Sequence, residues 1–143
     1  GKVSKIGTVK VPELFVIEPY ANVSHLVSTV TGKLKDSLSS TDIIKATFPG
    51  GSITGAPKIR AMEIIDELEP TQRNVYTGSV GYIGFNGDMD FNIAIRTLIK
   101  KDKNIFFQVG GGITWDSNPE EEYQETLDKA KSIMKAVRGY YEE

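Results

Sequence analysis

The chain has 143 residues, with 17 basic and 19 acidic residues and a net charge of −2, which is the size of one ordinary domain. Nucleic-acid-binding surfaces need a clustered basic excess, so the balanced charge argues against such a partner. The chain contains no cysteine, which excludes disulfides and fits a reducing cytoplasm. Apolar runs are far shorter than the roughly 20 residues of a membrane span. We therefore expect a cytoplasmic protein with neither a nucleic acid nor a membrane as partner.

The first third of the chain predicts two strands and a short helix. Residues 8–20 alternate in polarity and are rich in β-branched and aromatic residues, which predicts one or two strands with Pro12 at a break or an edge. Residues 22–34 predict a further strand with a mixed face. Residues 39–48 predict a helix with Ser40 or Thr41 as its N-cap.

The rest of the chain predicts two amphipathic helices and three strands. An apolar stripe predicts a helix from Ala56 to Leu68, with Pro57 in its first turn. Strands over 74–85 and 89–99 meet across "NGD", a strong hairpin signal, and a strand over 104–115 follows. A long helix then begins after Asn118, which can cap it. Its predicted buried stripe consists of Tyr123, Leu127, Ala130, Ile133, Met134 and Val137.

This order of elements, with mostly hairpin connections, predicts an α+β fold with a largely antiparallel sheet and packed helices. We expect residues 1–143 to form a single partial domain, because the basic, turn-like start "GKVSKIG" reads as the middle of a longer protein.

The glycine-rich stretch "FPGGSITGAP" before the first long helix is a candidate anion site. A nucleotide-binding P-loop would need a hydroxyl residue directly after its lysine, but Ile59 follows Lys58. The spacing therefore excludes that reading and leaves a loop of free backbone N–H groups suited to an anion such as a carboxylate. A flexible connector is the alternative.

Three consecutive glycines in "QVGGGITWDS" form a second candidate. Glycine in a strand loses backbone entropy and packs no side chain, so a run of three needs a reason. Close approach of a ligand to bare backbone would supply that reason. A β-bulge or a local twist is the alternative.

One face of the last helix carries two carboxylates and a cation. Glu122, Glu125 and Lys129 lie at positions i, i+3 and i+7. If the face points inward, the carboxylates could hold a hard cation such as magnesium, and Lys129 could pair with a substrate anion. A solvated, salt-bridged face is the alternative.

Two single residues are also candidates. Arg96 interrupts an apolar strand beside the small side chains of Asn92 and Ala94. A buried arginine there would bind a carboxylate, either of a substrate or of an internal Asp or Glu. His25, the only histidine, could act as a general acid or base or be a hydrogen-bonded structural residue. Together these groups suggest a site for a small polyanion.

Five ordered motifs resemble the chorismate-utilising enzymes. They are "VKVPELFVIEPY", "HLVSTVTG", "FPGGSITGAPKIRAMEIIDELEP", "GSVGYIGFNGDMDFNIAIRTL" and "GGGITWDSNPEEEYQETLDKA", and they cover nearly the whole chain. The resemblance implies a portion of the chorismate-binding fold, namely the C-terminal part of the catalytic domain. It is strongest to the component I branch of aminodeoxychorismate (para-aminobenzoate) synthases, with the component I branch of anthranilate synthases next.

The resemblance implies roles for the last helix and the glycine triplet. Glu125 resembles the family's magnesium ligand, and Glu122 lies near that metal. Lys129 matches the lysine that faces the substrate's ring carboxylate. The backbone of Gly110, Gly111 and Gly112 matches a nest for a substrate carboxylate.

Further roles follow for residues earlier in the chain. Tyr76 and Arg96 match a pair that grips the enolpyruvyl carboxylate. His25 matches a histidine near the departing 4-hydroxyl. Thr54 and Gly55 belong to "GSITGAP", which resembles a loop that closes over the ring carboxylate and the metal.

The resemblance implies an aminodeoxychorismate synthase activity in folate synthesis, a transferase reaction with ammonia from a glutamine amidotransferase subunit. Anthranilate synthase component I is the alternative enzyme, and a non-catalytic anion-binding module is an alternative of another class. In the family, a segment upstream of these motifs carries a lysine motif and another magnesium-binding glutamate. We therefore expect that this chain alone does not turn over chorismate, and that its exposed apolar surface promotes self-association.

Overall fold

The computed structural model describes residues 1–19 and 24–141, and it confirms the α+β class. The side chains of His25, Tyr140 and Tyr141 also lie outside the description. The chain divides into two compact units, Gly1–Phe48 and Pro49–Glu143. A single domain over 1–143 stays a prediction.

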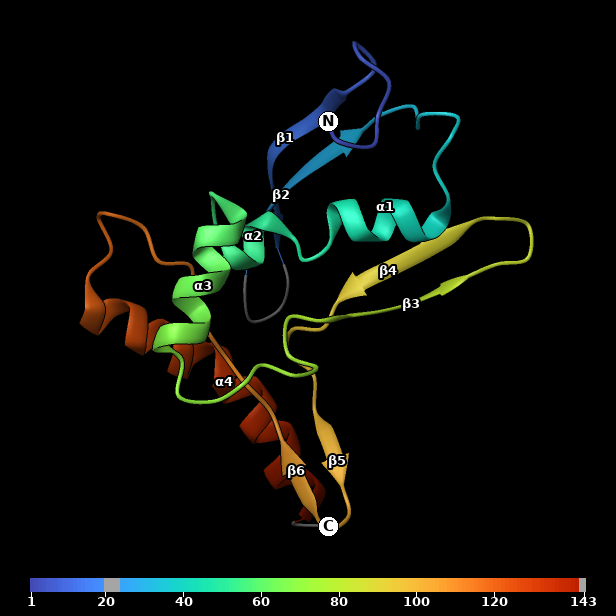
Figure 1. Cartoon of the computed structure of the whole chain (residues 1–143). Coiled ribbons are helices and arrows are strands. Elements are labelled where there is room, and N and C mark those ends of the chain that lie inside the picture. Colours follow the sequence, from blue (N-terminus) through green and yellow to red (C-terminus); the bar gives the residue numbers. More distant parts are fainter. Residues whose placement is uncertain (20–23, 142–143) are drawn as a thin grey trace. The chain divides into compact units, whose positions relative to one another are not determined.

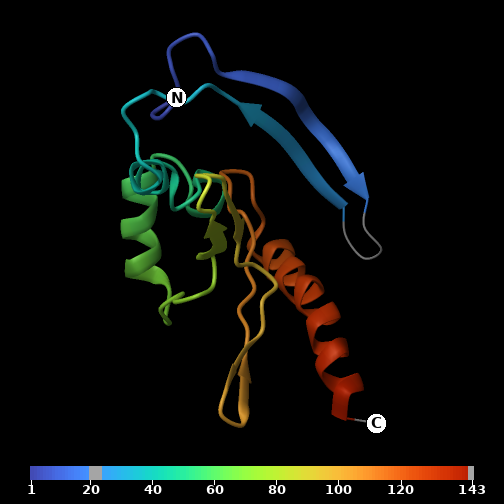
Figure 2. The ribbon, with the colours of Figure 1, turned by 90° about the vertical axis from the view of Figure 1, so that its right-hand side faces the viewer.

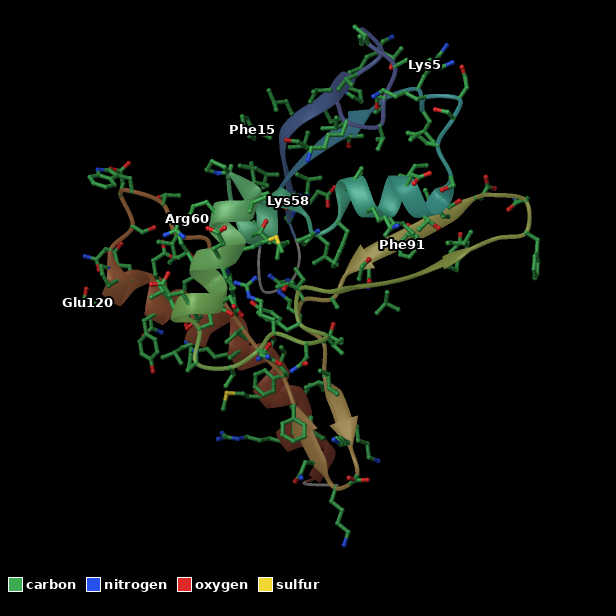
Figure 3. The ribbon with its side chains drawn as sticks, in the orientation of Figure 1. Lys5, Phe15, Lys58, Arg60, Phe91 and Glu120 are labelled. Atoms are coloured by element: carbon green, nitrogen blue, oxygen red, sulfur yellow. The ribbon has the colours of Figure 1, made fainter. Side chains whose placement is uncertain are left out.

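In the first unit, strands β1 (Lys10–Pro19) and β2 (Ser24–Thr31) form an antiparallel ribbon (Figure 2). The register shifts twice, between Lys10 and Glu13 and between Glu13 and Val16. Pro12 lies within the first shift, where the strand pairing is already interrupted and the missing N–H of proline breaks no ladder hydrogen bond. This agrees with the predicted break at Pro12. Phe15 lies within the second shift, has a positive φ of 54° and is 66% exposed (Figure 3).

Helix α1 (Ser40–Thr47) completes this unit. Its N-cap is Ser39, so the prediction of Ser40 or Thr41 is wrong. The Ser39 hydroxyl accepts the Asp42 N–H at 3.2 Å, and the Asp42 carboxylate accepts the Ser39 N–H at 3.0 Å, which makes a reciprocal capping box. The Ser39 hydroxyl also donates to Asp42 Oδ2 at 2.6 Å, and this bond, together with the one from the Ser39 N–H, lowers the pKa of Asp42.

The second unit begins with helices α2 (Gly51–Thr54) and α3 (Lys58–Leu68) (Figure 1). The predicted start of the longer helix at Ala56 is two residues early. Gly55 has a φ of +109°, which ends α2, and Pro57 has an extended ψ of 135°. Pro57 is thus the N-cap of α3 and not part of its first turn.

Strands β3 (Ser79–Ile83) and β4 (Met89–Ile93) form the predicted hairpin, with Ile83 opposite Met89 and Gly87 in the turn at a φ of +91°. The single strand predicted over 89–99 is wrong. β4 ends at Ile93, and β5 (Ile99–Lys101) begins only after a turn in which Arg96 has a φ of +51°.

β5 pairs with β6 (Asn104–Phe106) in a second narrow hairpin, visible in Figure 1. The strand predicted over 104–115 is therefore too long, because its ladder stops at Phe106 and the glycine triplet lies beyond it. Helix α4 (Pro119–Tyr141) follows. Asn118 caps it as predicted, since its Oδ1 accepts the N–H groups of Glu120 and Glu121.

Among the described residues, the buried apolar side chains are Ala94, Ala130 and Ile133. Two of these belong to the stripe predicted for α4, whereas Tyr123 of that stripe is 66% exposed. An amphipathic stripe is buried only where another surface covers it. The described part of the chain therefore buries few apolar side chains, and the expected exposed apolar surface is confirmed. Within the described part of the chain, α4 and the shorter helices are not apolar enough over a sufficient length to cross a membrane.

Candidate functional site

The glycine triplet lies against the first half of α4, within the second unit. A Cβ added to Gly111 would lie 2.9 Å from Glu122 Oε2 and 3.8 Å from Glu125 Oε1. The two carboxylates therefore converge on one glycine. The predicted reason for the triplet is that a ligand approaches its bare backbone. In the structure, the groups that lie close to Gly111 are the side chains of Glu122 and Glu125.

The Glu122 carboxylate is held on one side only. Its Oε1 accepts a hydrogen bond from the Ser117 hydroxyl at 2.5 Å. Its Oε2 is buried and has no hydrogen-bond partner among the residues that the structure describes. Buried polar atoms are rarely left without a partner, so this oxygen is suited to a ligand.

Lys129 links the helix to the glycine backbone. Its ammonium pairs with Glu125 Oε1 and donates to the carbonyl oxygen of Gly110 at 3.3 Å. The side chains of Lys129 and Glu125 are 30% and 52% exposed. This face of α4 is therefore partly covered by residues 110–111 and is not a freely solvated charged face.

Tyr76 reaches the same glycine segment from the turn before β3. A Cβ on Gly110 would lie 2.7 Å from the Tyr76 hydroxyl oxygen. The Arg73 guanidinium lies 5.8 Å from the ring centroid of Tyr76 and donates three hydrogen bonds to the Glu69 carboxylate, at 3.1, 2.8 and 2.6 Å. Burial raises the pKa of Tyr76, which keeps its hydroxyl a hydrogen-bond donor.

Arg96 lies on a neighbouring segment but is not buried. The Thr77 N–H donates to the carbonyl of Ala94 and the Ala94 N–H to that of Gly78, both at 2.9 Å. These bonds bring the backbone after Tyr76 beside the backbone before Arg96. Arg96 is exposed, so the expectation of a buried arginine within a strand is wrong. Arg96 lies beyond Ile93, the last paired residue of β4, and has a positive φ of 51°.

The amides of Thr54 and Gly55 are already used within α2. They donate to the carbonyls of Gly50 and Gly51, at 3.2 and 2.8 Å. The expectation of free N–H groups at these two residues is therefore wrong, because one helical turn consumes them. A role for Thr54 and Gly55 in substrate binding stays a prediction.

His25 belongs to the other unit. Its backbone pairs with Glu18 in the β1–β2 ribbon, and its side chain lies outside the described residues. Its catalytic role is therefore a prediction only.

The carboxylates of α4 fit part of a magnesium site. Oxygen ligands suit Mg²⁺, and the unpartnered Oε2 of Glu122 beside Glu125 offers them. Within the residues that the structure describes, there is no cluster of three or more His, Asp or Glu side chains that could hold a metal. These two glutamates would therefore need further ligands from elsewhere.

Two residues that orient this site are not predicted from the sequence. Ser117 holds Glu122, and Arg73 lies over the ring of Tyr76. The i, i+4 spacing of Glu69 and Arg73 is a recognisable ion-pair signal. The bond from Ser117 to Glu122 joins the loop before α4 to the helix. No spacing rule in the sequence predicts it.

The family model for chorismate binding enzymes matches residues 1–135 of the chain. The chain belongs to this family of enzymes. It is 59% identical over 134 residues to aminodeoxychorismate synthase component 1 of Salmonella typhimurium (strain LT2), covering 94% of this chain and 30% of the relative. It is 52% identical over 137 residues to anthranilate synthase component 1 of Acinetobacter calcoaceticus, covering 96% of this chain and 28% of the relative.

A solved structure shows the same fold. The crystal structure of anthranilate synthase component I from Streptococcus pneumoniae TIGR4 superposes with a TM-score of 0.85 at 48% identity, covering 92% of this chain and 30% of that chain. The chain thus spans about 30% of the length of the relatives it matches. The activity of the whole protein is accordingly a matter of proposal.

Proposed function

We propose that this chain forms part of the chorismate site of an aminodeoxychorismate synthase component I. The reaction joins chorismate and ammonia to give 4-amino-4-deoxychorismate and water, a step toward para-aminobenzoate and folate. The observation that carries the proposal is the convergence of Glu122, Glu125, Lys129 and Tyr76 on Gly110 and Gly111. The 59% identity to a relative of that name supports this choice of branch.

The site offers groups of opposite charge to a substrate with two carboxylates. Lys129 and the backbone N–H groups of Gly110, Gly111 and Gly112 would receive the ring carboxylate. The Tyr76 hydroxyl and the Arg96 guanidinium would hold the enolpyruvyl carboxylate. His25 would protonate the departing 4-hydroxyl as a general acid.

Glu125 and Glu122 would hold Mg²⁺. When bound, this ion neutralises the ring carboxylate and withdraws electron density from the ring as a Lewis acid. The chain's own contribution is to orient Glu122 through Ser117 and to place the Lys129 ammonium beside Glu125. Thr54 and Gly55 would close over the bound carboxylate after a change in the α2 turn, which releases their amides.

Anthranilate synthase component I is the second candidate, since relatives of that name are 52–53% identical to this chain. The motifs "PGGSITGAP" and "GGGI" favour the aminodeoxychorismate branch, because anthranilate synthases more often resemble "PAGTxSGAP" and "GAGI". In either branch a glutamine amidotransferase subunit in the cytoplasm would supply ammonia.

Product analysis of the full-length protein tests the proposal. It is incubated with chorismate, Mg²⁺ and ammonium, and the products are identified by mass. We expect aminodeoxychorismate, which keeps the enolpyruvyl group. Anthranilate together with free pyruvate would move the protein to the other branch, and unchanged chorismate would contradict both candidates.

A further inference from the structure

We propose that Ser117 positions the Glu122 carboxylate for a divalent cation by occupying one of its oxygens and leaving the other free. The inference rests on the proposed function, since it deepens the account of the same site. It adds a residue of the loop before α4 to the two glutamates of the helix.

Ser117 is fixed by its own loop. Its N–H donates to the carbonyl of Thr114 at 3.2 Å, and its hydroxyl oxygen accepts the Thr114 N–H at 3.0 Å. These two backbone contacts close a turn over residues 114–117, and Asn118 begins the cap of α4 directly after it. These contacts within the loop fix the position of the Ser117 hydroxyl oxygen independently of its bond to Glu122.

The single hydroxyl proton of Ser117 is committed to Glu122. A serine hydroxyl has one donor, and the contact to Glu122 Oε1 measures 2.5 Å. This is the length expected of a hydrogen bond from a hydroxyl to an ionised carboxylate. The bond therefore fixes the rotation of the Glu122 carboxylate.

The consequence falls on the second oxygen. With Oε1 held by Ser117, Oε2 faces Gly111, where an added Cβ would lie only 2.9 Å away. Oε2 is buried and unpartnered within the described part of the chain, and Glu125 Oε1 lies near the same glycine. Without the Ser117 bond, the Glu122 carboxylate could rotate, and Oε2 would no longer be held in its position beside Gly111.

Groups that orient a metal ligand typically change metal affinity by 10-fold to 100-fold when they are removed. We therefore expect Ser117→Ala in the full-length protein to weaken Mn²⁺ binding by roughly 10-fold to 100-fold. Mn²⁺ serves as a paramagnetic substitute for Mg²⁺, and free Mn²⁺ is counted by electron paramagnetic resonance without chorismate. Ser117→Thr keeps the hydroxyl and should stay close to the unmodified protein.

Ser79→Ala is the matched control. It removes a hydroxyl on β3 that donates to the Asn92 carbonyl at 2.6 Å and not to either glutamate. Its Mn²⁺ affinity should equal that of the unmodified protein. Ser117→Ala with unchanged Mn²⁺ affinity would overturn the inference, as would equal weakening by Ser117→Ala and Ser117→Thr.

Glu122→Gln separates this inference from the proposed function. If Glu122→Gln weakens Mn²⁺ binding and Ser117→Ala does not, the cation site stands and the role of Ser117 is wrong. If neither variant changes Mn²⁺ binding, Glu122 is not a cation ligand, and the magnesium part of the proposed function fails together with the inference.

Discussion

The Tyr76 hydroxyl lies directly against the backbone of Gly110, so that a Cβ added there would sit 2.7 Å from the hydroxyl oxygen. The ring is not free to retreat, because the Arg73 guanidinium lies over it, 5.8 Å from its centroid, and is itself held by Glu69. Residue 110 must therefore be glycine, because the Tyr76 hydroxyl occupies the space of a Cβ. The Gly110 carbonyl also accepts a hydrogen bond from the Lys129 ammonium.

Gly110→Ala should therefore displace Tyr76. If Tyr76 holds a substrate carboxylate as proposed, the KM for chorismate should rise about 10-fold or more, because a single lost hydrogen bond to a charged group costs about 1.5–3 kcal/mol. Steady-state kinetics on the full-length protein measures this. Gly112→Ala, whose Cβ would meet nothing within 4 Å, should leave the nuclear magnetic resonance signals of the Tyr76 ring unshifted. Unshifted ring signals in Gly110→Ala would contradict the clash.

Arg73→Met should raise the pKa of Tyr76 further. The Tyr76 pKa is already raised by burial, and the Arg73 cation opposes that shift. Removing the cation leaves the phenolate less stabilised. Ultraviolet titration of the phenol measures the change. Arg60→Met is the control, because Arg60 pairs with Glu63 on the exposed side of α3. A lower Tyr76 pKa in Arg73→Met would contradict the prediction.

The raised Tyr76 pKa also gives stability a pH dependence. The folded state keeps its phenolic proton above the ordinary value of 10.0, where the unfolded state has lost it. The contribution of protonated Tyr76 to the free energy of unfolding is fully present below about pH 10 and is lost as the pH rises through the folded-state pKa of Tyr76. Tyr76→Phe should therefore lose less free energy of unfolding than the unmodified protein between neutral pH and the alkaline range, as followed by urea denaturation. Equal losses would contradict this linkage.

Lys129→Met should change cation and substrate binding in opposite directions. The Lys129 ammonium pairs with Glu125 and competes with a cation for that carboxylate. Partly exposed pairs are worth up to about 1 kcal/mol, so Mn²⁺ affinity without chorismate should rise up to about fivefold, while the KM for chorismate rises. Lys131→Met is a matched control, since Lys131 pairs with Asp128 and is 71% exposed. Weaker Mn²⁺ binding in Lys129→Met would show that the lysine supports the cation site.

The sequence predicts the hairpin at Gly87 and the cap at Asn118, because both depend on local chemistry that a few residues carry. It fails around Arg96, because β4 ends at Ile93 and Arg96 has a positive φ although it is not a glycine. It also misplaces the cap of α1, since Ser39, Ser40 and Thr41 are all capping residues. Only the reciprocal bonds between Ser39 and Asp42 distinguish the first of them.

The candidate site is predicted in part for a similar reason. Glu122, Glu125 and Lys129 share a helix face by spacing alone, and the structure places Glu125 and Lys129 together. Which groups meet that face is a tertiary property, so Ser117 and the carbonyl of Gly110 are missed. The spacing of "GSITGAP" likewise does not reveal that one helical turn uses the amides of Thr54 and Gly55.

Asn118→Ala should loosen the start of α4, where Glu120 is labelled in Figure 3. The Asn118 Oδ1 accepts the N–H groups of Glu120 and Glu121 at 3.0 and 3.2 Å, and loss of such a cap costs about 1 kcal/mol. We expect the free energy of unfolding of the full-length protein to fall by about that amount in urea denaturation, and the amides of Glu120 and Glu121 to exchange faster. Asn118→Ser keeps a capping oxygen and should retain most of the stability.

Because Glu122 lies in the same first turn, Mn²⁺ binding should weaken in Asn118→Ala and be restored in Asn118→Ser. Full Mn²⁺ affinity in Asn118→Ala would mean that the Ser117 bond alone is enough to hold Glu122 in place.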